Sequence, residues 1–146
     1  MNLRTEPRRS IAAESIYGLL NPIPFGCFVA ALIFDTIYSN SAVMLWDKGA
    51  AWLIVFGLLL AVVPRLVNLT QVWITSRRTA TRADKLDFWL NLFAIVVAVI
   101  NAFVHSRDAY AVVPTGLWLS ACTVTLLSVS HVLVAVERTA RGGVRP

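Results

Sequence analysis

Apolar residues along this chain gather in four long runs, each followed by a polar or charged stretch. The runs cover about residues 20–39, 49–69, 86–105 and 113–136. An α-helix needs about 20 mostly apolar residues to cross the hydrocarbon core of a bilayer. No strand-length segment alternates apolar and polar residues as a transmembrane barrel would. The pattern therefore predicts an all-α integral membrane protein with four transmembrane helices.

The composition points the same way. Hydrophobic residues make up 58% of the 146-residue chain and the mean hydropathy is +0.70. A soluble domain of this size is closer to half apolar, so lipid must replace part of the core. We expect a transmembrane domain at 18–137 between a basic N-terminal segment, 1–17, and a basic tail, 138–146.

The N-terminal segment carries Arg4, Arg8 and Arg9. No apolar segment with a small-residue cleavage site follows them, so no cleavable signal is predicted. Ser10 suits the N-cap of a short helix lying at the membrane interface before Pro22 redirects the chain. A plain linker is an equal alternative for this segment.

Basic residues are distributed unevenly about the four predicted spans. Three precede the first span, four lie between the second and third, and three follow the fourth. Only Lys48 and Arg107 fall on the other side, and Arg65 lies within the second span. The positive-inside rule then predicts cytoplasmic termini in a bacterial inner membrane. The pI of about 9.9 reflects this topology and attraction to anionic lipid headgroups, and nucleic-acid binding is not predicted.

A stripe of polar and small residues follows one face of the third span at spacings of three and four. Amides and imidazoles are unfavourable in hydrocarbon unless paired, so this face must point into a bundle. The other spans carry matching small or polar faces, which predicts an up-down-up-down four-helix bundle. The stripe consists of Asp84, Asp87, Asn91, Ala94, Ala98, Asn101 and His105. The matching faces include Gly26 with Ala30 and, beside them, Ala31, Asp35 and Tyr38 in the first span, Ala50, Gly57, Ala61, Pro64 and Asn68 in the second, and Gly116, Ser120, Thr123, Leu127 and Ser130 in the fourth.

Matching the spans by depth predicts two polar clusters, one at each end of the bundle. Asp35 is expected to meet His105 or Arg107 near the outer surface, and Arg65 to lie level with Asp87 near the inner surface. Such clusters serve either as contacts that hold helices together or as a substrate, quinone or proton site. The predicted outer cluster is Asp35, Asn101, His105 and Arg107, and the predicted inner cluster is Arg65, Asn68, Asp87, Asn91 and His131.

Motifs for most chemistries are absent from the sequence. The two histidines, His105 and His131, lie about 20 Å apart along the membrane normal at 1.5 Å per helical residue, too far to ligate one haem iron. Zinc-ligand spacing, a Walker loop and the nucleophile elbow are also missing. We therefore predict no catalytic residue, no metal site and no haem, while a bound quinone stays open.

The stretch "NPIPFGCFVAALIFDTIY", with the later "LLLAVVPRLVNL" and "DKLDFWLNLFAIVVAV", resembles a bacterial membrane family catalogued as domain of unknown function 2231. The resemblance covers about residues 18–136. Members commonly carry a His-Pro pair at the start of the first span, where this chain has Asn21 and Pro22. This departure weakens any haem role that the resemblance implies.

Two functions remain as hypotheses at this point. The first is a non-enzymatic accessory or anchoring subunit for a membrane-associated partner, or a homo-oligomer. The second, which the family resemblance also implies weakly, is a small redox or quinone-binding subunit. In the second case Asp35, Asn101 and His105 would form the site.

Overall fold

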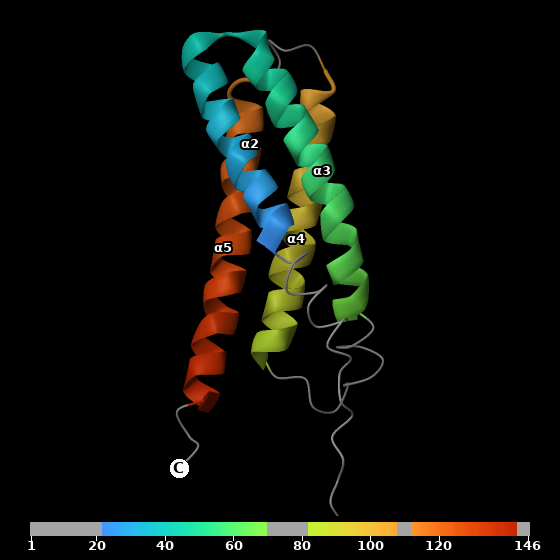
Figure 1. Ribbon diagram of the computed structural model, residues 1–146, viewed down its shortest axis with the longest axis vertical. Coiled ribbons are helices and arrows are strands. Elements are labelled where there is room, and N and C mark those ends of the chain that lie inside the picture. The colour runs from blue at the N-terminus through green and yellow to red at the C-terminus, as the bar shows by residue number, and fades with distance from the viewer. Residues whose placement is uncertain (1–21, 70–81, 108–111, 143–146) are drawn as a thin grey trace, which may run out of the picture.

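Four α-helices make up the described part of the chain in a computed structural model, which covers residues 22–69, 82–107 and 112–142 (Figure 1). The helices are α2 (Pro22–Ser41), α3 (Met44–Leu69), α4 (Arg82–His105) and α5 (Thr115–Gly142). Each is long and apolar enough to cross a membrane. The predicted four-helix membrane fold is therefore confirmed, while the predicted helix within residues 1–17 lies outside the described residues.

The helices run alternately up and down and surround a single core (Figure 1). Helix α2 packs against α3, and α4 against α5, while the contacts of α2 with α5 and of α3 with α4 close the ring. The helix ends differ from the predicted spans in one way that affects the site. Helix α3 begins at Met44, not at position 49, so Asp47 and Lys48 belong to its first turns.

A sharp turn joins α2 to α3. Ala42 adopts a left-handed conformation, with φ of 53°, and its N–H bonds the carbonyl of Tyr38 at 2.8 Å. A left-handed residue in this position is a common way to end a helix. The hydroxyls of Thr36 and Ser41 donate to carbonyls one turn earlier, which satisfies these polar groups within the helix. The turn places the start of α3 beside the end of α2.

Helices α4 and α5 pack antiparallel in a regular register. Asn91 lies opposite Ser130, and Asn101 lies opposite Ser120, each pair joined by a hydrogen bond of 2.7 Å. The two contacts are ten residues apart on both helices, so the register holds over about 15 Å. Between them α4 buries the small apolar Ala94 and Ala98, and α5 buries Thr123 and Leu127.

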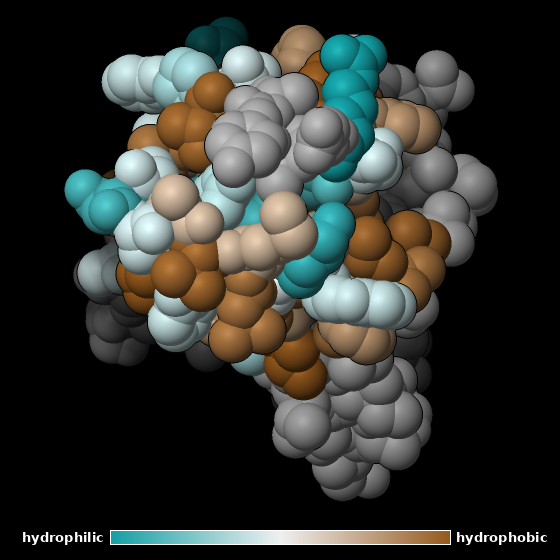
Figure 2. All heavy atoms as spheres, turned by 90° about the horizontal axis from the view of Figure 1, so that it is seen from above, coloured by the Kyte–Doolittle hydropathy of each residue, from teal (hydrophilic) through white to brown (hydrophobic). Residues whose placement is uncertain are grey.

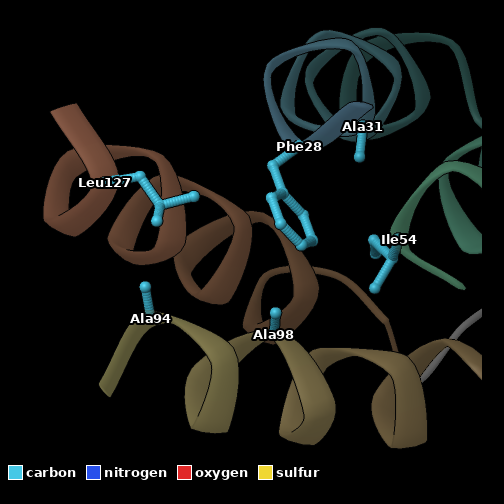
Figure 3. Close-up of a cluster of buried hydrophobic side chains, with 6 residues drawn as sticks. All are labelled: Phe28, Ala31, Ile54, Ala94, Ala98 and Leu127. Atoms are coloured by element: carbon cyan, nitrogen blue, oxygen red, sulfur yellow. The ribbon is translucent and has the colours of Figure 1, made fainter. Parts of the chain in front are cut away.

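The apolar core lies midway along the bundle. The Phe28 ring extends from α2 toward the small faces of α4, and Ile54 approaches from α3 (Figure 3). Small residues at the contacts let membrane helices approach closely. A Cβ added at Gly57 would lie 3.0 Å from the Phe28 ring, so α2 and α3 are in close contact there. The core residues are Phe28, Ala31, Ile54, Ala94, Ala98 and Leu127.

The outside of the bundle is apolar along its length. Large side chains such as Leu59, Phe103 and Trp118 are more than 60% exposed. In a protein with four membrane-spanning helices these side chains contact lipid, which explains how a chain this apolar remains stable with a small core. Seen from the end that carries the α2–α3 turn, hydrophilic and hydrophobic residues are mixed (Figure 2). We call this the outer end, after its predicted orientation.

Candidate functional site

Asp35 is the centre of a buried polar network at the outer end. Its side chain, on α2, is 2% exposed. One carboxylate oxygen lies 2.8 Å from Nε2 of His105 on α4, and the other accepts a 2.5 Å hydrogen bond from Ser120 on α5. Pairing of this kind offsets the cost of burying a carboxylate in a membrane-embedded core. Asp35 therefore joins three of the four helices.

The surroundings of His105 set its tautomer. Its Nδ1 lies 3.0 Å from the backbone carbonyl of Asn101, which only accepts hydrogen bonds, so Nδ1 carries a hydrogen. The contact between Nε2 and Asp35 then requires one proton, held on either the imidazole or the carboxyl group. In both forms the pair is neutral overall. His105 and Asp35 thus form a proton-sharing pair without net charge.

Asn101 completes the contacts on this side. Its amide NH₂ donates to Ser120 Oγ at 2.7 Å, and the same hydroxyl donates to Asp35. Asn101 and Ser120 are 1% and 3% exposed. The amide carbonyl of Asn101 is also buried but has no hydrogen-bond partner in the described part of the chain. One acceptor of this network is therefore unsatisfied.

Asp47, on α3, is the residue that sequence reasoning missed. It is fully buried and lies close enough to His105 and Asp35 to interact with both electrostatically. Neither of its carboxylate oxygens has a hydrogen bond within the described residues. The Lys48 ammonium is 4.0 Å from one oxygen, but the lysine side chain is 59% exposed. We define the outer network as Asp35, Asp47, Asn101, His105 and Ser120.

A signal for Asp47 was present in the sequence. Counting back from the predicted face of span two, Asp47 precedes Ala50 by three residues. The spacing of three and four then continues through Ile54, Gly57 and Ala61, all of which are buried. The predicted span began at position 49, and this boundary left Asp47 in a loop. Extending the periodic face by one further step, three residues before Ala50, would have included Asp47.

Arg107 was also predicted in the outer cluster. It lies just beyond the end of α4 and is exposed. Asp35 is contacted by His105 and Ser120 instead. His105 lies on the buried face of α4 and Ser120 on the buried face of α5, both at the level of Asp35. Arg107 therefore does not belong to the outer network.

The inner half of the bundle holds a second, smaller network of Asp87, Asn91 and Ser130. The Asn91 amide donates to Asp87 Oδ1 at 2.8 Å and to Ser130 at 2.7 Å, and Ser130 donates to the same Asp87 oxygen. This inner network repeats the Asp, Asn and Ser composition of the outer one, without a histidine or a second carboxylate. Arg65 and Asn68 lie on α3, and their side chains fall outside the described residues.

His131, predicted in the inner cluster, has a different environment. Its ring packs edge-on against Phe25, with ring centroids 5.1 Å apart. Both residues line a small crevice that is otherwise apolar, with Phe28, Ala61 and Leu127 among its walls. In the α4–α5 register His131 lies near the level of Leu90, about 20 Å from His105. The two histidines therefore cannot ligate the same iron.

Metal binding is not supported by the donor geometry in the described part of the chain. No group of three or more His, Cys, Asp or Glu side chains there is arranged to hold an ion. The outer network can instead hold and exchange a proton, since it combines an imidazole, two carboxylates and a hydroxyl.

A comparison with protein families gives one match, which covers residues 15–135 and all four helices apart from the end of α5. Comparison with curated proteins and with solved structures gives no match. The matched length is most of the chain, and the family description agrees with the four membrane-spanning helices found here. The chain therefore belongs to the family of predicted membrane proteins designated DUF2231.

Proposed function

We propose that this membrane protein is an accessory subunit of a membrane-associated partner, and that the outer network is its functional site. The observation that carries this proposal is the Asp47 carboxylate, which is fully buried beside Asp35 and His105 without a hydrogen bond from the described residues. The proposal places the protein in a bacterial inner membrane with both termini in the cytoplasm, as the distribution of Lys and Arg predicts.

A purely structural role explains the inner network but does not explain Asp47 in the outer network. Interhelical hydrogen bonds within membranes contribute about 0.6 to 2 kcal/mol each, and the inner network consists of such bonds. A buried carboxylate without a hydrogen bond has the opposite effect, because desolvation of an ion costs several kcal/mol. Asp47 therefore lowers stability where an uncharged residue would not. A functional role accounts for its presence.

The position of the outer network, at one end of the bundle, supports a role at one membrane face. Phe28, Ile54 and Leu127 pack together in the apolar core (Figure 3), at the level between the Asn91–Ser130 and Asn101–Ser120 contacts. The hydroxyl of Thr123, also buried at this level, donates to the Leu119 carbonyl, so protons and ions meet few hydrogen-bonding groups there and cross it poorly. A role in supporting a partner at the outer face fits this arrangement better than transport across the bilayer.

The second candidate is a small redox or quinone-binding subunit. The observation that favours it is the pairing of a hydroxyl and an imidazole with a carboxylate, since quinone reduction needs both hydrogen-bond donors and a source of protons. The crevice among the described residues lies elsewhere, beside His131 and Phe25. Extraction of stoichiometric quinone from purified protein would favour this candidate.

Native membranes provide the test. A strain lacking the gene is complemented with the wild-type protein, with Asp47→Asn, or with the inner-network variant Asn91→Ala. Complexes are resolved on native gels and respiratory and transport activities are measured. We expect a complex that is lost without the gene, and an activity that Asn91→Ala restores but Asp47→Asn does not. Identical complexes and activities with and without the gene would disprove an accessory role.

A further inference from the structure

We infer that the outer network binds one exchangeable proton on Asp47, taken from water at the outer end of the bundle. The inference rests on the proposed role of the outer network and specifies its ligand. Two atoms carry it, the carboxylate oxygens of Asp47, which are both buried and without hydrogen bonds from the described residues.

The chemistry of these two atoms defines the missing species. Both are hydrogen-bond acceptors, so an additional acceptor or an anion would be repelled. A hydrogen-bond donor or a cation is required. A buried acceptor without a hydrogen bond is destabilising, and more so when it is charged.

A proton fits this requirement better than a metal ion. The described residues offer no set of three His, Cys, Asp or Glu ligands around a common point. The proton also needs no cavity, which agrees with the close packing of His105 against Gly116, where an added Cβ would lie 2.9 Å from the imidazole. The site is built from groups that exchange protons.

Charge balance assigns the proton to Asp47 and not to Asp35. The Asp35–His105 pair already contains the one proton that its 2.8 Å contact requires, and it is neutral. Asp47 is the remaining carboxylate. The exposed Lys48 ammonium lies 4.0 Å away, and the imidazole of His105, which also interacts with Asp47, belongs to the neutral pair. Adding a proton removes the uncompensated buried charge.

The charged and titratable groups that interact with Asp47 come from α2, α3 and α4. Helix α2 contributes Asp35, α3 contributes Lys48, and α4 contributes His105, with Arg107 exposed beyond its end. On α5 the segment 115–130 contains no Asp, Glu, Lys, Arg or His. The step is a simple transfer in which hydronium gives its proton to the Asp47 carboxylate and leaves water, and no electron moves.

Infrared difference spectroscopy of the purified full chain in lipid vesicles tests this inference. We expect a protonated-carboxyl C=O band that shifts in D₂O and disappears as the pH is raised, and the release of one more proton per chain from the wild type than from Asp47→Asn. This band should be missing from Asp47→Asn, and Asp47→Glu should restore the proton count with a displaced band. The control Asp87→Asn, in the inner network, should leave the band unchanged.

Two results would overturn the inference. One is a carboxyl spectrum and a proton count that are the same in the wild type and in Asp47→Asn. The other is a carboxylate spectrum that changes when sodium replaces choline at constant pH, which would show a metal cation in the site. These measurements need no partner, so they can succeed where the native-membrane test fails. Failure of the accessory role and failure of the proton site are thereby distinguished.

Discussion

Gly116 on α5 lies directly against the imidazole of His105 on α4. A Cβ built at position 116 would approach Cε1 of His105 to 2.9 Å and Cγ1 of Val112 to 2.6 Å. The contact continues the register set by the Asn91–Ser130 and Asn101–Ser120 hydrogen bonds. The absence of a side chain at 116 lets α5 approach closely enough for Ser120 to reach Asp35.

Gly116→Ala is therefore expected to destabilise the bundle. The added methyl group must displace the imidazole or the helix, and overpacking of this kind costs about 1 to 3 kcal/mol. Thermal unfolding in detergent measures the effect. The matched control is Gly26→Ala on α2, where nothing lies within 4 Å of the added Cβ. An equal loss of stability in both variants would show that the contact with His105 is not the cause.

Asp47→Asn is expected to stabilise the protein. Once the pH is high enough for Asp47 to release its proton, the substitution removes a buried charge that lacks a hydrogen bond and relieves its desolvation penalty, with a gain of about 1 to 3 kcal/mol. Asp35→Asn should have the opposite effect, because it breaks the contacts with His105 and Ser120 and costs about 3 to 5 kcal/mol. Unfolding of both variants above the pH at which the Asp47 proton is released compares them. Destabilisation by Asp47→Asn would mean that Asp47 has a stabilising partner.

The Asn101–Ser120 hydrogen bond is expected to contribute modestly to helix packing. A double-mutant cycle with Asn101→Ala and Ser120→Ala should give a coupling energy of about 0.6 to 1.7 kcal/mol. The corresponding cycle for Asn91 and Ser130 should give a similar value, since its hydrogen bond has the same length of 2.7 Å. A coupling energy near zero in both cycles would show that these hydrogen bonds do not determine the register.

Orientation in the membrane can be checked with single cysteines introduced at exposed positions. Cys27 and Cys122 are first replaced by serine or alanine, since both are free thiols. Val43→Cys, in the turn between α2 and α3, should react with an impermeant reagent added outside intact cells. Ala140→Cys, near the end of α5, should react only after the membrane is opened. The reverse pattern would overturn the orientation predicted from the basic residues.

Periodicity was sufficient to predict which faces of the helices are buried where spans were drawn correctly. On α4 the residues Asn91, Ala94, Ala98, Asn101 and His105 are all buried, at spacings of three and four. On α2 the predicted face was less accurate, because Gly26 is exposed while Phe28 fills the core. Small residues resemble packing positions in sequence, but a large side chain fills the space between four helices more effectively.

The sequence alone determined the class, the number of spans and the polar faces, because each depends on spacing and hydropathy within one helix. Only the tertiary structure decided which polar residues meet. The partner of Asp35 depends on the heights at which α2, α4 and α5 pack, and these heights follow from the α2–α3 turn and the α4–α5 register. The same packing buries Asp47 within electrostatic range of His105 and leaves Arg107 exposed, a difference that arises from contacts between helices far apart in the chain.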